Sequence, residues 1–321
     1  MASRERPRRS RSSAKRIAPP SRSVSTSVLQ HLSFPSPSPS QESCIWNGKA
    51  FLIEGQEVSV LTYDTSQSAW TDELTSFHEE VAGENHYIDL ASRNHAIRAL
   101  RPRIHTQGAV IIDIGCSSGS MLRLLRTNFP EATLIGADYT RGSLLKLASS
   151  LTGVPLLQFN LVNCPLFSNS VDAVILLNVL EHIEDDLAAM KQVFRITKRG
   201  GVAVIEVPSG PHLYDIYDKQ LLHHRRYRLN QLCADLTTVG FQVEERSHLG
   251  AFLYPAFAAV KRRNRRYANY SDEEQRRIVA KKISQGRASP LMNGVMRIEE
   301  ALRSYIHYPA GIRCLVTCRK P

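Results

Sequence analysis

"VIIDIGCSSGS", residues 110–120, joins an apolar run to an acid, a glycine and a cluster of small residues. The apolar run predicts a buried strand, and "SMLRLLRTNF" directly after the turn predicts an amphipathic helix. A strand that leaves a glycine turn as a helix places free backbone N–H groups and a positive dipole end at the carboxyl edge of a sheet. We therefore expect a nucleotide-like ligand at this turn.

Strands and helices alternate on both sides of this turn. Six further apolar runs predict strands at 132–138, 154–159, 171–177, 201–207, 241–247 and 312–320. Amphipathic helices are predicted between most of them, at 141–151, 184–198 and 229–240. This alternation with short links predicts an α/β fold with a doubly wound, Rossmann-like sheet that helices cover on both faces.

Four other segments surround the predicted core at 106–250. Residues 1–43 predict a disordered basic tail or an organelle transit peptide, because they are rich in Arg and Ser and nearly free of acids. Residues 44–105 predict a helical lid segment that begins with a short hairpin. Residues 251–306 predict a helical insertion that forms a substrate lid, with a capping box at Ser271 and Glu274. Residues 307–321 hold a closing strand.

The formal net charge of +11 is concentrated in two places. Residues 1–43 hold eight Lys or Arg, residues 261–287 hold ten, and the remainder is slightly acidic. The six cysteines form no CxxC pair, which fits reduced thiols inside a cell. No run of eighteen apolar residues occurs, so we expect no membrane span. The expected location is the cytoplasm, or an organelle if the tail is a transit peptide.

The glycine turn departs from a dinucleotide fingerprint. That fingerprint reads G-x-G-x-x-G, whereas this turn has only Gly115 and Gly119, with Ser117 at the middle glycine position. The order D-x-G-x-x-x-G, with Asp113 as the acid, resembles the first motif of class I S-adenosylmethionine-dependent methyltransferases. Gly115 allows the tight turn, and Gly119 is expected to let the ligand approach the backbone.

Further motifs follow along the chain in the same order as in this family. "IGADYT" ends the next strand at Asp138, nineteen residues after Gly119, where an acid can accept both ribose hydroxyls. "FNLVNCPLFSNSVDAV", "LLNVLEHIEDD" and "ITKRGGVAVIEVP" resemble later family segments. "HHRRY" followed by "GF", at 223–241, resembles small-molecule methyltransferases of the ubiquinone-type O-methyltransferase kind. The resemblance covers roughly 85–321.

The resemblance implies a seven-stranded sheet whose last strand is antiparallel, S-adenosylmethionine as cofactor and a small-molecule methyl acceptor. Whether the nucleophile of the acceptor is oxygen, nitrogen or carbon stays open. The residues that it places at the cofactor are Asp113, Gly115, Cys116, Ser117, Gly119, Asp138, Tyr139, Asn160, Leu161 and Asn178. Two positions depart from the family. Asn160 stands where an Asp usually accepts a bond from the adenine amine, and Ser117 is tolerable only with ordinary backbone angles.

Methyl transfer from a sulfonium requires alignment of a nucleophile and removal of its proton. Histidine suits the second task because its pKa lies near neutrality. The candidate catalytic residues are His182, which follows the fourth strand, and His223, His224 and Tyr227, which follow the fifth. Arg225, Arg226 and Glu181 are candidate substrate-binding residues. For each group a structural role remains open: His182 as a packing residue, and 223–227 as a solvated loop. No metal-binding set is recognised.

Three alternatives stay open besides a small-molecule acceptor. "VKRRNRRYANY" places basic residues beside Tyr267 and Tyr270, as nucleic-acid binding would need, but an N-P-P-Y tetrapeptide and a Pro-Cys pair are absent after the fourth strand. "AFLYPAFAAVKRRNRR", at 251–266, is compatible with a peripheral membrane helix or a buried lid helix. The last alternative is a partner subunit that keeps the fold without catalysis.

Overall fold

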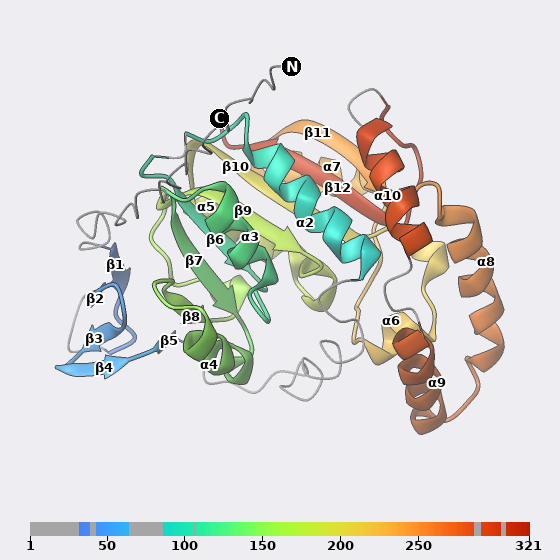
Figure 1. The fold of residues 1–321 in the computed structure, drawn as a ribbon, viewed down its shortest axis with the longest axis horizontal. Coiled ribbons are helices and arrows are strands. Elements are labelled where there is room, and N and C mark those ends of the chain that lie inside the picture. The colour runs from blue at the N-terminus through green and yellow to red at the C-terminus, as the bar shows by residue number, and fades with distance from the viewer. Residues whose placement is uncertain (1–31, 39–42, 64–85, 106, 286–289, 303–305) are drawn as a thin grey trace, which may run out of the picture.

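The computed structural model describes residues 32–38, 43–63, 86–105, 107–285, 290–302 and 306–321. Its centre is an eight-stranded sheet in the order β11-β12-β10-β9-β6-β7-β8-β5 (Figure 1). The strands span Val60–Thr62 (β5), Val110–Ile114 (β6), Thr133–Asp138 (β7), Leu156–Gln158 (β8), Val171–Leu177 (β9), Thr197–Pro208 (β10), Gln242–Leu249 (β11) and Arg313–Arg319 (β12). Every strand expected from residue 109 onward is present.

Strand directions confirm the doubly wound fold. The pairs from β10 through β9, β6, β7 and β8 to β5 are parallel, whereas β12 lies antiparallel between β10 and β11. One strand was not expected: β5 extends the sheet beside β8. Leu61 of β5 is fully buried there. Without β5, the three-residue strand β8 would form an open edge of the sheet. The residues of β5 lie in the segment 44–105, which was expected to begin with a hairpin.

Helices cover the two faces of the sheet (Figure 1). One face packs against α2 (Tyr87–Leu100), α3 (Ser120–Asn128) and α4 (Arg141–Ser150). The other packs against α5 (Asp186–Ile196) and α7 (Leu229–Val239). Consecutive residues of β6 alternate between the faces, with Ile111 on the α2 side and Ile112 on the α5 side, as a strand's period of two requires. The glycine turn therefore emerges from a fully packed strand.

A small antiparallel sheet precedes the core. It consists of β1 (Leu32–Pro35), β2 (Ser43–Trp46), β3 (Phe51–Ile53) and β4 (Gln56–Val58). Phe34 packs edge-on against Phe51 at a ring separation of 5.4 Å, and both rings are buried. The disordered tail expected over 1–43 therefore ends earlier than expected, and the hairpin expected at the start of 44–105 lies within this antiparallel sheet. The rest of the tail, and residues 64–85 of the predicted helical lid segment, lie outside the described residues.

The insertion between β11 and β12 is helical. It holds α8 (Tyr254–Asn264), α9 (Asp272–Gln285) and α10 (Pro290–Leu302). The capping box at the start of α9 is confirmed, since the Ser271 N–H donates to Glu274 Oε2 at 3.0 Å and the Ser271 hydroxyl accepts from the Glu274 N–H at 3.4 Å. Met296 of α10 packs with Ile88 of α2 and Ile312. The insertion is thereby attached to the core.

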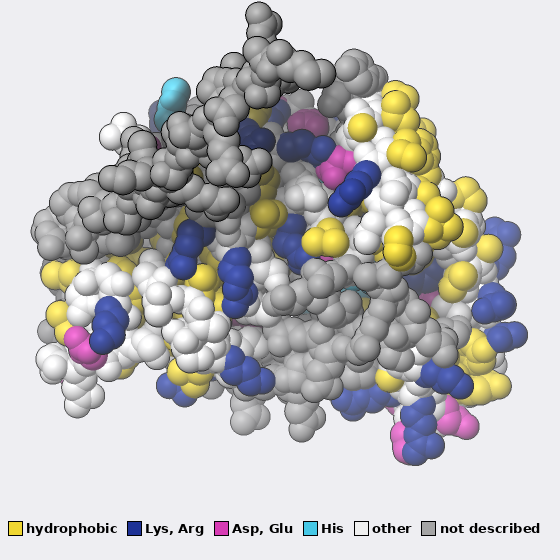
Figure 2. All heavy atoms as spheres, viewed as in Figure 1, with side chains coloured by type: hydrophobic (Ala, Val, Ile, Leu, Met, Phe, Trp, Pro, Cys, Tyr) yellow, Lys and Arg dark blue, Asp and Glu magenta, His cyan; other side chains and the backbone are white. Residues whose placement is uncertain are grey.

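Exposed apolar side chains gather on the insertion. Figure 2 shows hydrophobic side chains over α10 and α8 at the right of the view. Leu291 and Ile298 of α10 are 69% and 58% exposed, and Val260 of α8 is 44% exposed. None of the helices that the structure describes has the length and apolar character needed to cross a bilayer.

A buried ion cluster joins the last strand to the core. Arg313 of β12 donates to Glu206 of β10 at 2.7 Å and to Asp89 of α2 at 2.5 Å. The Ser92 hydroxyl also donates to Glu206 at 2.7 Å. Glu206 is fully buried, so its charge depends on these partners.

We expect Arg313→Met to lower the free energy of unfolding by about 3–5 kcal/mol, because it leaves a buried carboxylate without its cation. The matched control is Arg319→Met on the same strand. Arg319 pairs with Glu244 at a partly exposed site, so its loss should cost about 1 kcal/mol or less. Urea denaturation of both variants measures the difference, and equal costs would contradict the importance of the buried cluster.

Candidate active site

The glycine turn has the backbone shape that its sequence predicts. Gly115 and Gly119 have φ of +80° and +79°. A Cβ on Gly115 would lie 2.5 Å from Val179 Cγ2, and one on Gly119 would lie 2.5 Å from Leu147 Cδ1. The lack of a side chain at Gly119 therefore allows α3 to pack against α4, and its role in ligand approach stays a prediction.

Ser117 occupies a strained conformation. Its φ is +43°, in the left-handed region that disfavours residues other than glycine. From the sequence, serine is expected to be tolerated at this position only with ordinary backbone angles. The structure does not show such angles at Ser117. The strained backbone lets the Ser117 N–H donate to Asp138 Oδ2 at 2.9 Å. The turn is thereby tied to the end of the neighbouring strand β7.

Asp138 organises this edge of the sheet. Its Oδ1 accepts from the Thr140 N–H at 2.9 Å and from the Thr140 hydroxyl at 2.8 Å. A carboxylate offers about four lone-pair sites. Asp138 therefore holds the turn in place, and it lines the cavity described below.

Asp113 ends β6 with a buried carboxyl group. It is 3% exposed, and its Oδ2 has no hydrogen-bond partner among the described residues. Burial, reinforced by the nearby charge of Asp138 and opposed by that of Arg93, raises the pKa of Asp113 to about 7. A cationic group brought to this oxygen would favour the ionised form.

The remaining predicted cofactor residues lie near the same edge. Asn160 caps the short 3-10 helix η2 (Leu161–Asn163) by accepting from the Val162 N–H at 3.1 Å. Asn178 has φ of +56°, and its amide donates to Glu206 Oε1 at 3.3 Å. Both side chains are partly buried and line the cavity described next.

A cavity of about 1170 Å³ runs along this edge of the sheet. All predicted cofactor residues except Gly119 line it, as do Glu181, His182, His223, His224 and Arg226. The cavity is also lined by Leu221, Leu222, Phe257 and Val260, together with Lys261 and Arg313. One space therefore joins the glycine turn to the predicted catalytic histidines.

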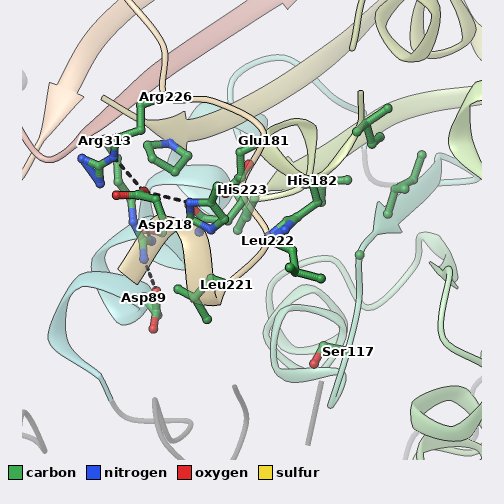
Figure 3. A pocket seen from close by; sticks show the side chains of 18 of the residues that line it. Asp89, Ser117, Glu181, His182, Asp218, Leu221, Leu222, His223, Arg226 and Arg313 are labelled. Atoms are coloured by element: carbon green, nitrogen blue, oxygen red, sulfur yellow. Dashed lines mark hydrogen bonds and ion pairs between the residues drawn. The ribbon is translucent and has the colours of Figure 1, made fainter. Parts of the chain in front are cut away.

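Glu181, His182 and His223 form a cluster within the cavity (Figure 3). Glu181 and His182 belong to the 3-10 helix η3 (Leu180–His182), whereas His223 follows α6 (Ile216–Gln220). The two imidazole rings meet edge-on with centroids 4.7 Å apart. Burial raises the pKa of Glu181 to about 8, more than the nearby charge of Arg313 lowers it.

Asp218 of α6 holds His223. Its Oδ1 accepts from His223 Nδ1 at 2.9 Å and from Arg226 Nε at 3.0 Å, and its Oδ2 accepts from Lys261 Nζ at 2.9 Å. Burial opposes ionisation of Asp218, but the His223 hydrogen bond and the charges of Lys261 and Arg226 outweigh it and lower its pKa far below the usual range. Because an ionised carboxylate only accepts, His223 Nδ1 must carry the proton.

The other candidates have different positions. Tyr227 is buried, donates to Asp186 Oδ2 at 2.7 Å and is not among the cavity residues. Arg225 also pairs with Asp186, at 2.7 Å, outside the cavity lining. His224 is exposed and lines the cavity, and its backbone N–H donates to the backbone carbonyl of Glu181 at 2.7 Å. Arg226 lines the cavity, anchored to Asp218. Tyr227 and Arg225 thus have structural contacts instead of the predicted catalytic and substrate roles.

Sequence reasoning missed the residues that support His223. Asp215 and Asp218 form a capping box on α6, and Lys261 and Asn264 of α8 bond to Asp215 at 2.6 and 2.8 Å. Lys261 belongs to the basic stretch for which nucleic-acid binding, a peripheral membrane helix and a buried lid helix are the open alternatives, and it is 6% exposed. The Asp215-Asp218 spacing was a detectable capping signal, but nothing in the sequence indicates its pairing with α8.

Comparisons with known proteins agree with this geometry. The methyltransferase domain family matches residues 112–205. A probable S-adenosylmethionine-dependent methyltransferase of Mycolicibacterium smegmatis is 28% identical over 174 residues, 54% of this chain and 65% of that protein. The trans-aconitate 2-methyltransferase of Acidovorax sp. is 26% identical over 115 residues, 36% of this chain and 44% of that protein. The chain thus spans less than two thirds of these curated relatives.

Two solved structures share the fold. A putative sarcosine dimethylglycine methyltransferase from Galdieria sulphuraria has a TM-score of 0.53 at 17% identity, over 78% of this chain and 98% of that one. Phosphoethanolamine N-methyltransferase 2 of Haemonchus contortus has a TM-score of 0.52 at 18% identity, over 79% of this chain and 59% of that one.

The order of strands, the glycine turn and these matches define a class I S-adenosylmethionine-dependent methyltransferase domain. The core of the chain, residues 112–205, matches that domain family, and S-adenosylmethionine is the cofactor in the name of the Mycolicibacterium smegmatis relative. The cavity fits that cofactor, since the turn is open at Gly115 and the buried Asp113 oxygen has acceptor capacity. The likeness to ubiquinone-type enzymes stays a prediction.

Cofactor affinity should rise with pH if Asp113 holds the methionine amine, as the resemblance implies. A carboxyl with a pKa of about 7 is mostly protonated at pH 6 and mostly ionised at pH 8, so the dissociation constant should fall about tenfold between them. Asp113→Asn should remove the pH dependence of the dissociation constant that comes from this carboxyl group. The pH dependence that comes from ionisation of the ligand itself should remain. Calorimetric titration at several pH values tests this, and an unchanged profile in the variant would contradict the role of Asp113.

Ser117→Gly should raise the free energy of unfolding by up to about 1 kcal/mol, because it relieves the left-handed strain at φ +43°. Ser118→Gly is the matched control. Ser118 is not among the residues with positive φ, so glycine there should cost about 0.5–1 kcal/mol. Urea midpoints of both variants give the comparison. Destabilisation of equal size in both would show that Ser117 carries no strain.

Proposed function

We propose that the protein transfers a methyl group from S-adenosylmethionine to an oxygen or nitrogen of a small molecule. The observation that carries the proposal is the single cavity of about 1170 Å³, which extends from the glycine turn to the histidine cluster. Donor and acceptor can therefore share one space. Relatives named for trans-aconitate and phosphoethanolamine support a small acceptor.

The cofactor end of the site would be held by Asp113, Asp138 and the glycine turn. When bound, S-adenosylmethionine supplies a methyl carbon on a sulfonium, and the C–S electron pair returns to sulfur as the acceptor's lone pair forms the new bond. Asp138 would accept from the ribose, and Asp113 would accept from the amine. Asn160 would face the adenine, with a neutral amide in place of the usual charge.

The acceptor end is formed by the apolar residues Leu221, Leu222 and Phe257 beside the polar cluster. An acceptor with an apolar body would pack there and present its O–H or N–H to His182 and His223. His223 Nδ1 is held by Asp218 at 2.9 Å, which leaves the lone pair on Nε2. In the metal-free enzyme, this nitrogen would accept the proton that the acceptor loses.

Titration of the protein with S-adenosylmethionine and with its demethylated product tests the cofactor site. Asp138→Ala should weaken binding at least tenfold, because the variant loses both the ribose acceptor and the bond to Ser117. The matched control is Asp172→Ala. Asp172 lies near the amino end of β9, where it accepts from the Val110 N–H at 2.8 Å, so its loss should leave the affinity unchanged. Equal effects, or no binding by the unaltered protein, would reject the site.

Methyl transfer is tested with radiolabelled cofactor and an unfractionated cell extract, whose small molecules, protein and nucleic acid are separated after the reaction. Label should enter small molecules, and His223→Gln should lower the rate by about 10²- to 10⁴-fold without changing cofactor affinity. His105→Gln, at an exposed position before the core, should change neither. Label found only in protein or nucleic acid would overturn the small-molecule proposal.

A membrane-surface site is the second candidate, because apolar and basic side chains are exposed together on α8 (Figure 2). Val260 is 44% exposed, and Arg262 and Arg263 are exposed beside it. Such a helix face can bind an anionic membrane surface. Flotation with anionic liposomes, with Val260→Asp as the variant, separates this candidate from a lid that binds only small molecules.

A further inference from the structure

The cluster at the acceptor end brings together three possible metal ligands. One carboxylate oxygen of Glu181 and one ring nitrogen each of His182 and His223 all lie within 4.8 Å of one another. They come from two separate segments, η3 and the loop after α6, and meet inside the cavity (Figure 3). This arrangement was not recognised from the sequence, where no metal-binding set was expected.

Glu181 is the first reason to place an ion there. Its side chain is fully buried, and neither carboxylate oxygen has a hydrogen-bond partner among the described residues. A buried carboxylate without partners costs several kcal/mol. Arg226 already bonds to Asp218, and Arg313 already bonds to Glu206 and Asp89. Both nearby arginines therefore form their ion pairs with carboxylates other than that of Glu181.

His223 is the second reason. Its Nδ1 donates to the ionised Asp218, so the neutral ring presents the Nε2 lone pair on its other side. A ligating histidine commonly donates its other N–H to a carboxylate, which fixes the ring and strengthens the ligand. Asp218 is held in turn by Arg226 and Lys261. The supporting contacts of a metal ligand are thus already formed.

We propose that Glu181, His182 and His223 bind one divalent transition-metal ion of the Zn²⁺ kind. One carboxylate oxygen and two imidazole nitrogens are a donor set that such ions accept, with positions left for an exogenous ligand. All three residues line the cavity. An acceptor hydroxyl or a water can therefore complete the coordination.

The role of the ion in catalysis rests on the proposed methyl transfer, whereas its binding does not. A coordinated acceptor hydroxyl loses its proton more easily, because the ion stabilises the oxygen anion. The O–H bond breaks, its electron pair stays on oxygen, and the proton leaves to water. The acceptor would then be an oxygen nucleophile, and His223 would act as a ligand instead of accepting the proton.

The test uses the full-length protein after treatment with a chelator and dialysis. Titration calorimetry with Zn²⁺ alone should give one site per chain, and X-ray absorption should show only nitrogen and oxygen ligands at about 2.0–2.2 Å. Glu181→Gln and His223→Gln should each weaken binding at least tenfold. His105→Gln is the control for surface histidines and should bind as the unaltered protein does. Cofactor titration and circular dichroism show that each variant is folded.

Several results would overturn the proposal. They are no Zn²⁺ site, sulfur ligands in the absorption spectrum, or unchanged affinity in folded Glu181→Gln and His223→Gln. Methyl transfer that is equally fast with and without chelator would overturn the catalytic role even if the ion binds. Loss of cofactor binding in the unaltered protein would instead reject the proposed function, so the two failures are distinguishable.

Discussion

The acceptor side of the cavity depends on one carboxylate, that of Asp218. It accepts four hydrogen bonds, from the Asp215 N–H, His223, Arg226 and Lys261. Its side chain is 1% exposed, so ionisation requires these partners. The charges nearly balance, because Asp215 and Asp218 face Lys261 and Arg226. These ion pairs join α6, the loop at 223–226 and α8 into one unit. The ionised Asp218 also determines which nitrogen of His223 carries a proton.

The cofactor half of the site was predictable because its signals are local. Strand β6, the glycine turn and α3 are continuous in the chain, and Asp138 ends the next strand. Parallel strands bring their carboxyl ends to one edge, so Asp113 and Asp138 had to meet there. The strain at Ser117 was not predictable, since its φ of +43° follows from the hydrogen bond between its N–H and Asp138.

The acceptor half was only partly predictable, because long-range contacts form it. His182 and His223 were identified by type and position, but their approach depends on how α6 packs. Tyr227 and Arg225 stand beside His223 in the sequence, yet both bond to Asp186 outside the cavity lining. Neighbouring residues in a loop point in different directions, and only tertiary packing selects among them. The burial of Lys261 within a basic run has the same cause.

The division between the two halves has a consequence for specificity. The methyltransferase domain family matches residues 112–205, which include the glycine turn, Asp138 and His182. His223, Asp218 and Lys261 all lie beyond that region, on α6, the loop after it and α8. The side chains that would hold the donor thus come from the shared core, whereas those that orient His223 come from later elements and the insertion. Because Lys261 contributes charge to Asp218 from the insertion, changes in α8 would alter both the shape of the acceptor pocket and the state of His223. In the proposed function, acceptor choice and proton removal would therefore be coupled through the contact between Lys261 and Asp218.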